Sequence, residues 1–372
     1  MNKAKKAKPH EIISNRGFAK YFHGRKEILR NFTVLLEDSL RNNKGTNFLF
    51  QGAPGVGKTA LLEKCKEFAI NKGWDVVKIK PNGLWDPSQL KKYLGSERMM
   101  KLRKLLLKGE VGGIGGHAEI EFSKKSVLEI LETGKSPLLL TLDEAQTLGG
   151  NNRPPDEHLS TVTDVLDEIH NGGFQRPLIL VISGLGPTRN ILKSFGISRF
   201  NTKCSVDLGP LDKKSERAVI NDWLVREGKA RETPNVWIGS ITKETHQWPH
   251  HIMSYVIPAV NELQKANGNM TSELLKKVMI AGRKDRFDYY EKRTSEFDKL
   301  DRHVIAKTFA FDDEMEGFHR KQIVSSFSNE FNASESKELF DKALLNGVIS
   351  MDCDSYKISI PSMKDWLLSN YS

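Results

Sequence analysis

Hydrophobic positions in the first 210 residues form short apolar runs that alternate with amphipathic segments. The apolar runs predict strands at residues 47–51, 75–80, 138–142, 178–183 and 203–208, and the amphipathic segments predict helices at residues 58–72 and 160–170. Strands that alternate with helices predict a parallel sheet covered by helices on both faces. We therefore predict an α/β domain over residues 1–210, with its ligand site at the carboxyl edge of the sheet.

The pattern changes after Pro210, where helical periodicity replaces the apolar runs. Helices predicted at residues 213–226 and 249–265 indicate a helical lid over residues 211–282. A third unit, residues 283–372, contains predicted helices and then two strands separated by a polar turn, at residues 300–309, 320–327, 334–345, 348–352 and 356–360. Three helices followed by a hairpin are typical of a winged helix.

A glycine-rich segment directly follows the first predicted strand. Residues 48–62 read FLFQGAPGVGKTALL and complete the phosphate-loop motif G-x-x-x-x-G-K-T. The glycines allow backbone N–H groups to surround phosphate, Lys58 supplies a charge for the β- and γ-phosphates, and the Thr59 hydroxyl suits Mg²⁺. The residues expected to contact ATP here are Gly52, Gly55, Val56, Gly57, Lys58, Thr59 and Ala60.

Two carboxylates end the third predicted strand, in the sequence PLLLTLDEAQ. Asp143 is placed to hold Mg²⁺ through water, and Glu144 to orient or deprotonate the attacking water. The alternative for this pair alone is a solvated acidic turn. Together with the phosphate loop, it predicts hydrolysis as well as binding.

Composition indicates a protein that stays in the cytoplasm. Cys65, Cys204 and Cys353 are odd in number and lack C-x-x-C spacing, so they suggest neither a disulfide framework nor a zinc site. No apolar stretch approaches the length of a membrane span, and the lysines of the N-terminal MNKAKKAKPH precede no apolar signal-peptide core. We expect no membrane partner.

Charge is unevenly distributed along the chain. Residues 283–372 contain 14 Lys and Arg against 17 Asp and Glu, a net charge of −3. Because the whole chain carries +10, the first 282 residues carry +13. DNA would meet this basic part first, including the tail with Lys3, Lys5, Lys6 and Lys8. The alternative is that surplus lysines only maintain solubility.

The glycines clustered at residues 112–116 predict a mobile loop or hairpin. This tract could contact DNA or another subunit, or it could be an ordinary turn between two strands.

Taken together, these motifs resemble the AAA+ ATPases of the origin-recognition and initiator type, which are related to the STAND and transposition-regulator ATPases. The resemblance covers nearly the whole chain and implies a nucleotide-binding α/β domain, a helical lid and a winged helix in this order. The segment FHGRKEIL at residues 22–29 is similar to the family's F-x-G-R-x-x-E-L motif. It implies that Gly24 and Arg25 border the adenine pocket, although the segment by itself could be a turn leading into a helix.

The resemblance also implies catalytic roles beyond the two motifs. Ser183 matches the sensor 1 position, where a polar side chain faces the γ-phosphate. Arg199, in GISRFNTKCSVDLGPL, matches the arginine finger that acts on the site of a neighbouring subunit, with Arg189 as the second candidate. A finger that acts in trans implies a homo-oligomer.

The lid segment THQWPHHIMSY departs from the family's G-x-P pattern. Pro249 matches, but Gln247 replaces glycine, and His250 or His251 stands at the sensor 2 position. A neutral imidazole carries no fixed charge, so coupling between lid and γ-phosphate is expected to be weak or sensitive to pH. The histidines lack the spacing of a further metal site.

Two functions remain open. One is an ATPase that switches an oligomer acting on DNA, of the initiator, loader or transposition-regulator kind. The other is a STAND-like signalling or defence ATPase that recruits a protein client through its C-terminal unit. The predicted helix at 334–345 carries Glu335, Glu338 and Asp341 against Lys337 and Lys342, which argues against tight phosphate contact, whereas His319, Arg320 and Lys321 could form a basic edge.

Overall fold

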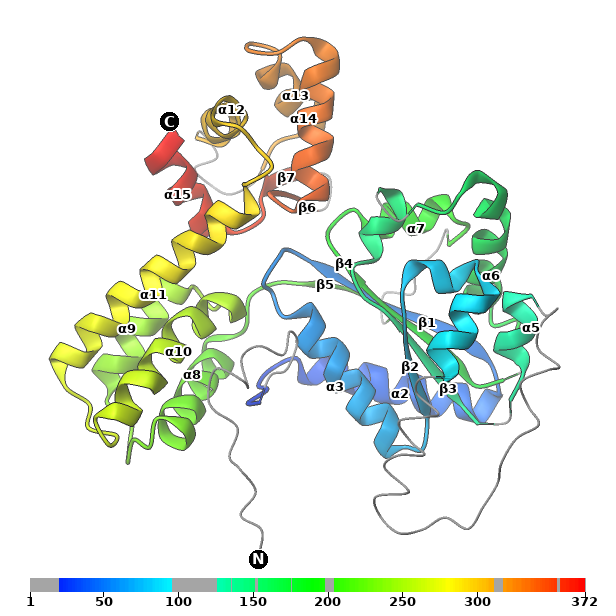
Figure 1. The fold of residues 1–372 in the computed structure, drawn as a ribbon, viewed down its shortest axis with the longest axis horizontal. Coiled ribbons are helices and arrows are strands. Elements are labelled where there is room, and N and C mark those ends of the chain that lie inside the picture. Colours follow the sequence, from blue (N-terminus) through cyan, green and yellow to red (C-terminus); the bar gives the residue numbers. More distant parts are fainter. Residues whose placement is uncertain are drawn as a thin grey trace, which may run out of the picture.

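The computed structural model describes residues 20–95, 126–134, 136–150, 153–174, 176–197, 204–310, 317–352 and 355–371. Figure 1 shows a sheet domain at the right, a helical lid at the lower left and a C-terminal unit above the lid. The glycine tract, the lysine tail, Arg199 and Cys353 lie outside the described residues.

The sheet has five parallel strands in the order β2-β3-β4-β1-β5. Their bounds are Gly45–Gly52 (β1), Asp75–Ile79 (β2), Leu138–Leu142 (β3), Leu178–Gly184 (β4) and Ser205–Leu208 (β5). All five predicted strands are present, and the α/β fold class is confirmed. Strands β3 and β4 flank each other in the middle of the sheet, so that Leu142 pairs with Ile182 at their carboxyl ends.

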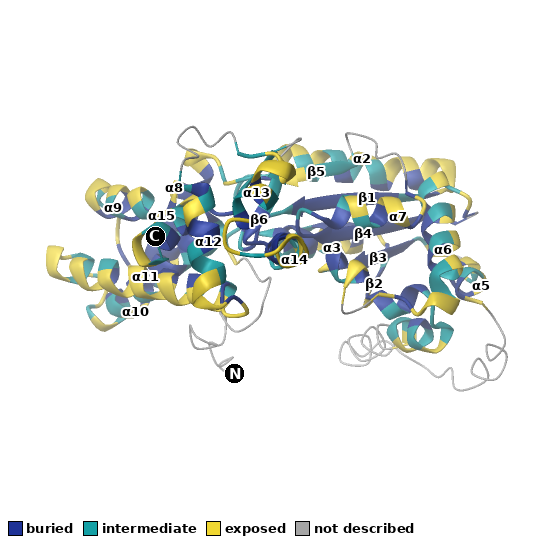
Figure 2. Ribbon diagram, turned by 90° about the horizontal axis from the view of Figure 1, so that it is seen from above, coloured by how far each residue is buried: buried dark blue, intermediate teal, exposed yellow. Residues whose placement is uncertain are grey.

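Both faces of the sheet are covered, which explains the continuous apolar runs in the sequence. Helices α2 and α3 pack on one face, and α5, α6 and α7 pack on the other. Their bounds are Lys26–Asn42 (α2), Lys58–Asn71 (α3), Val127–Glu132 (α5), Leu159–Asn171 (α6) and Thr188–Ser194 (α7). Neighbouring strand residues point to opposite faces: Leu139 packs with the α2 and α3 side and Leu140 with the other. Figure 2 shows the strands as buried and the outer helix faces as exposed.

The lid is built from helices α8, α9, α10 and α11. Their bounds are Lys213–Asp222 (α8), Asn235–Thr245 (α9), Pro249–Lys265 (α10) and Ser272–Arg293 (α11), and a π-helical turn, Trp223–Glu227, follows α8. The Asp212 side chain caps α8 by accepting from Ser215 N, and Thr271 caps α11 in the same way. The predicted domain boundary at residue 282 lies within α11, so one continuous helix leads from the lid into the C-terminal unit (Figure 1).

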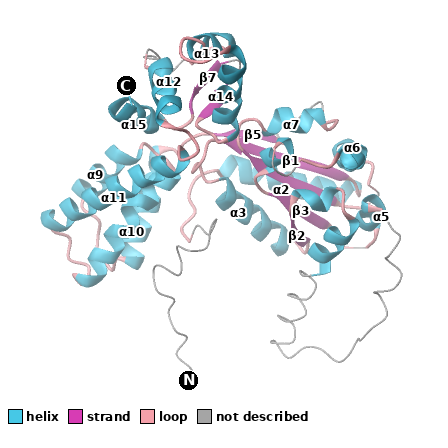
Figure 3. Cartoon of the chain, turned by 45° about the horizontal axis from the view of Figure 1, so that its top comes forward, coloured by secondary structure: helices cyan, strands magenta, loops and turns pink. Residues whose placement is uncertain are grey.

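The C-terminal unit has the predicted order of three helices and a hairpin. Its elements are Lys299–Phe309 (α12), Arg320–Phe327 (α13), Ala333–Leu345 (α14), Ile349–Asp352 (β6), Ser355–Ile358 (β7) and Pro361–Tyr371 (α15). Strands β6 and β7 form an antiparallel hairpin, drawn next to α14 in Figure 3. Phe318 adds an isolated bridge to Tyr356. Helix α15 was not predicted. It buries Met363 and Leu367 and packs on α12 and α11.

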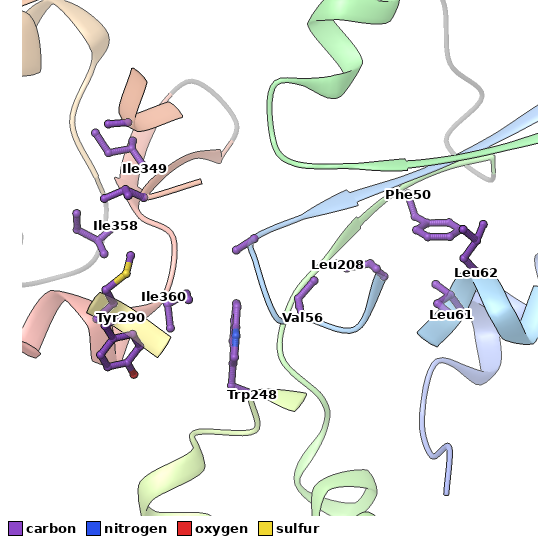
Figure 4. Packing of buried hydrophobic residues seen from close by; sticks show 14 of the residues in the cluster. Phe50, Val56, Leu61, Leu62, Leu208, Trp248, Tyr290, Ile349, Ile358 and Ile360 are labelled. Atoms are coloured by element: carbon purple, nitrogen blue, oxygen red, sulfur yellow. The ribbon is translucent and has the colours of Figure 1, made fainter. Parts of the chain in front are cut away.

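The three parts share one hydrophobic core at the point where they meet. Figure 4 shows Trp248 of the lid between Val56 of the phosphate loop and Ile360 of the C-terminal unit. All three side chains are nearly inaccessible to solvent. The position of the C-terminal unit is therefore fixed, in part, by contacts at the phosphate loop.

In the described part of the chain, no helix is long and apolar enough to span a bilayer.

Candidate nucleotide-binding site

The phosphate loop connects the end of β1 to the start of α3. Gly55 and Gly57 have φ values of 76° and 95°, a conformation that favours glycine because a side chain would be strained there. The Lys58 ammonium donates to the carbonyl oxygens of Gly52 (2.9 Å) and Ala53 (3.0 Å). The loop therefore curls around its own lysine, at the amino end of a helix, as a phosphate cradle requires.

Lys58 is buried, and burial lowers the pKa of its ammonium to about 8, against the opposing effect of the Glu144 and Asp143 charges. A buried cation without a fixed carboxylate partner benefits strongly from an added anion. The site thus fits the negative charge of a triphosphate.

Asp143 lies at the centre of the acidic strand end. It accepts hydrogen bonds from the Thr59 hydroxyl (3.1 Å, to Oδ2), from the Ser183 hydroxyl, and from Glu144 N (3.0 Å, to Oδ1). Strands β3 and β4 and helix α3 thereby bring three predicted site residues together. A hydroxyl beside a carboxylate is the oxygen donor set that Mg²⁺ takes next to a phosphate, so Thr59 and Asp143 fit this ion.

Glu144 is exposed and has a left-handed backbone, with φ of 56°. Its Oε2 accepts from Gln146 Nε2 (2.6 Å), and Gln146 Oε1 in turn accepts from Leu185 N after β4 (3.0 Å). Gln146 is buried and holds the carboxylate in one orientation. Our sequence analysis missed it, although its place two residues after Glu144 offered a signal.

Gly24 and Arg25 lie beside the hinge, defined here as residues 209–212, which joins β5 of the sheet to α8 of the lid. The Arg25 guanidinium donates to the carbonyl oxygens of Gly209, Pro210 (3.2 Å) and Val56 (3.4 Å). A Cβ on Gly24 would stand 2.9 Å from Ser215 Oγ, so this position accepts only glycine without rearrangement. Arg25 therefore ties the N-terminal segment to the phosphate loop and to the hinge.

The lid contacts the phosphate loop through the start of α10. Trp248 Nε1 donates to the Pro54 carbonyl (3.0 Å) and His250 N donates to the Gly55 carbonyl (3.1 Å). A Cβ added to Gly57 would lie 3.6 Å from Pro249 Cγ, so the proline ring packs next to this glycine. These contacts place Pro249 and His250 against the phosphate loop.

The two histidines of the lid have different surroundings. The His250 ring stacks on Tyr289, with ring centroids 3.8 Å apart, and burial lowers its pKa. Its Nδ1 is buried and has no hydrogen-bond partner within the described residues. His251 instead points into the protein, where its Nε2 contacts the Tyr290 hydroxyl (3.2 Å). Of the two, only His250 lies against the phosphate loop.

A cavity of about 690 Å³ opens beside Glu144, between the sheet domain and the C-terminal unit. Helix α14 forms its far wall and the end of α11 forms one side. It is lined by Glu144, Gln146, Thr147, Gly150, Leu185, Arg293, Glu296, Ser334, Lys337, Glu338, Asp341, Lys342, Leu345 and Asn346.

The two arginine-finger candidates differ in what the structure describes. Arg199 lies outside the described residues, and its role stays a prediction. Arg189 donates to Ser205 Oγ (2.8 Å) and to Asp207 Oδ2 (2.9 Å) on β5 of its own chain. In this structure the Arg189 guanidinium is thus engaged by β5 of its own chain.

Solved structures with a similar fold include the ADP form of the ORC2 protein of Aeropyrum pernix, which is 12% identical, matches over 97% of both chains and has a TM-score of 0.60. A Walker-type ATPase of Pyrococcus abyssi is 17% identical, covers 94% of this chain and 97% of its own, and has a TM-score of 0.56. This chain shares the fold of these two proteins, which agrees with the predicted α/β AAA+ fold class. No protein-family model and no curated protein matches the sequence, so the likeness is one of structure.

The AAA+ fold accounts for where the site lies. Its parallel sheet places the carboxyl ends of β1, β3 and β4 at one edge, and the lid contacts that edge through Trp248, just before α10.

Another structure of the Aeropyrum pernix protein, in ADPNP-ADP complexes, is 12% identical to this chain, covers 95% of it and 96% of its own, and has a TM-score of 0.53.

Proposed function

We propose that this protein is an ATPase that switches an oligomer acting on DNA. The observation that carries the proposal is the contact of Thr59 with Asp143, at 3.1 Å, beside the buried ammonium of Lys58. Residues 84 positions apart in the sequence thus form one site for a metal-bound triphosphate.

Each site residue has a distinct task in this proposal. Lys58 and the loop N–H groups hold the phosphates, and Thr59 and Asp143 hold Mg²⁺, which would neutralise phosphate charge when bound. Glu144 accepts a proton from the attacking water, and Gln146 keeps the Glu144 carboxylate oriented toward it. The Ser183 hydroxyl donates to Asp143, so in this proposal Ser183 acts on the site by orienting this carboxylate.

Similar structures support the nucleotide, and the charge of the sequence supports DNA. The structures similar to this chain include nucleotide complexes, ADP in one case and ADPNP with ADP in another. The net charge of +13 on the first 282 residues suits a polyanion. In this proposal Arg199 completes the site of a neighbouring subunit, the C-terminal unit is a winged helix, and the protein works in the cytoplasm.

One observation favours the second function, a STAND-like ATPase that recruits a protein client. On α14, Asp341 pairs with Arg320 (2.9 Å), and Lys342 pairs with Asp301 (3.3 Å). These contacts offset part of the positive charge that phosphate binding would need on this helix. A C-terminal unit with a net charge of −3 suits a protein surface better than DNA.

Two substitutions test the ATPase. Lys58→Ala should abolish ATP binding because it removes the buried cation, and Glu144→Gln should keep binding while turnover falls by about 100-fold or more. Equilibrium binding of labelled ATP and release of phosphate measure the two effects. Normal turnover in Glu144→Gln would contradict the proposed mechanism, and unchanged ATP binding in Lys58→Ala would contradict the site itself.

A further inference from the structure

Arg293 is the last residue of α11 and lines the cavity that contains Glu144. It is half-buried and forms no salt bridge with any described residue. The other arginines of this helix differ, since Arg283 and Arg286 both pair with Glu244, at 2.5 Å and 3.2 Å. The Arg293 guanidinium therefore has no carboxylate partner among the described residues, and its charge is available to an added anion.

Stacked side chains hold Arg293 in place above the phosphate loop. Its guanidinium carbon lies 5.5 Å from the centroid of the Tyr289 ring, and the same ring stacks on His250. The Tyr289 hydroxyl stands 3.0 Å from an ideal Cβ on Gly55. Arg293 is thus tied to the loop through Tyr289, rather than extended into solvent.

The cavity carries charges of both signs, and Arg293 is the lining cation whose charge acts on the phosphate loop. Arg293 adds positive charge at the loop, since it lowers the pKa of Lys58 and of His250, although burial is the larger cause for both. The carboxylates that line the cavity are those of Glu144, Glu296, Glu338 and Asp341, and its other cations are Lys337 and Lys342 on α14. Of these six groups, only Glu144 belongs to the sheet domain, and it lies at the end where phosphate would bind.

We propose that Arg293 is the lid's contact to the γ-phosphate of ATP within the same chain. This inference rests on the proposed ATPase and assigns the contact to the end of α11, whereas the sequence pattern placed it at His250 on α10. A guanidinium offers a planar, permanently charged donor set that matches phosphate oxygens, and an imidazole with a lowered pKa does not. Because α11 continues into the C-terminal unit, the helix that contacts the phosphate also positions that unit.

The difference between a triphosphate and a diphosphate ligand tests this assignment. The variants are Arg293→Ala, Arg293→Lys and, as a matched control, Lys292→Ala, which removes one positive charge from the neighbouring exposed residue outside the cavity. Dissociation constants for AMPPNP and for ADP, both with Mg²⁺, are measured on the full chain, with Lys58→Ala as the reference for a disabled site. Equal melting temperatures establish that the variants are folded.

We expect Arg293→Ala to raise the dissociation constant for AMPPNP by about 10-fold or more, as for loss of one charge-assisted hydrogen bond, and to change that for ADP by less than about twofold. Arg293→Lys should keep part of the preference, and Lys292→Ala should keep all of it. Equal weakening of both nucleotides, or no change in either, would overturn the assignment. If wild-type protein binds neither nucleotide better than Lys58→Ala does, the ATPase proposal itself fails.

Discussion

At the scale of single residues, burial decides which polar groups serve the site and which serve the fold. Gln146 is buried, donates to the Glu144 carboxylate and accepts from Leu185 N, so it orients that carboxylate. Arg189 is held by Asp207, so it stabilises β5 rather than reaching outward. His250 and His251 are adjacent, yet only His250 faces the phosphate loop.

His251 should make the protein sensitive to acid. It is fully buried beside Tyr290, and burial lowers its pKa from 6.5 to about 3. The unfolded chain therefore binds a proton below pH 6.5 that the folded chain does not, so stability is lost as pH falls from 6.5 toward 3. This single group should lower the free energy of unfolding by about 2 kcal/mol between pH 7 and pH 5.

Urea unfolding of wild type and His251→Gln at both pH values measures this effect. Glutamine can still contact the Tyr290 hydroxyl but does not titrate. The loss between pH 7 and pH 5 should be smaller in the variant by about that amount, and an identical loss would show that His251 does not titrate as described.

At the scale of elements, the phosphate loop is held from three sides. Strand β1 and helix α3 continue it, α10 donates to it through Trp248 and His250, and the turn after α14 approaches it where Gly347 meets Pro54. A Cβ on Gly347 would stand 2.7 Å from Pro54 Cγ. Any movement of the loop on binding a ligand is therefore transmitted to the lid and to the C-terminal unit.

Trp248→Phe should weaken the contact between the lid and the loop. The change removes the hydrogen bond to the Pro54 carbonyl and leaves that carbonyl buried. Trp74→Phe is the matched control, because Trp74 is equally buried but its Nε1 has no hydrogen-bond partner within the described residues. In thermal unfolding, Trp248→Phe should be the more destabilised by about 1 kcal/mol. Equal melting temperatures for the two variants would contradict the role of this bond.

At the scale of the whole molecule, charge separates the two ends of the chain. The basic part, residues 1–282, contains the nucleotide site and the lid, and the acidic part begins within α11. The two parts are packed together at the phosphate loop rather than joined by a linker. A ligand of one part can therefore affect the other.

Duplex DNA should bind the basic part. A fourfold rise in salt should weaken binding by roughly 10- to 500-fold for two to five phosphate contacts. Fluorescence anisotropy with a labelled duplex measures this. A variant with Lys3, Lys5, Lys6 and Lys8 changed to alanine should lose affinity and part of the salt dependence, whereas Arg320→Ala with Lys321→Ala should change both less. If the protein assembles on ATP to the same extent with and without DNA, the proposed action on DNA would be contradicted and a protein client would be favoured.

The sequence by itself determined the five strands, two of the four lid helices (α8 and α10), the phosphate-loop motif and the acidic strand end. These depend on local patterns: apolar runs of strand length, glycines before Lys58, and Asp143 directly after a buried strand. It also indicated the hairpin, but not α15, whose weakly amphipathic pattern becomes a helix by packing on α12 and α11.

Only the tertiary structure decided which distant side chains meet. Tyr289 and Arg293 lie more than 140 residues after Glu144, and no local pattern distinguishes them from other residues of a charged helix. Their place beside the phosphate loop follows from the packing of α11 on α10, whose preceding residue Trp248 lies between the loop and the C-terminal unit. Long-range packing of this kind depends on the shape of the whole core, so it cannot be derived from the periodicity of one segment.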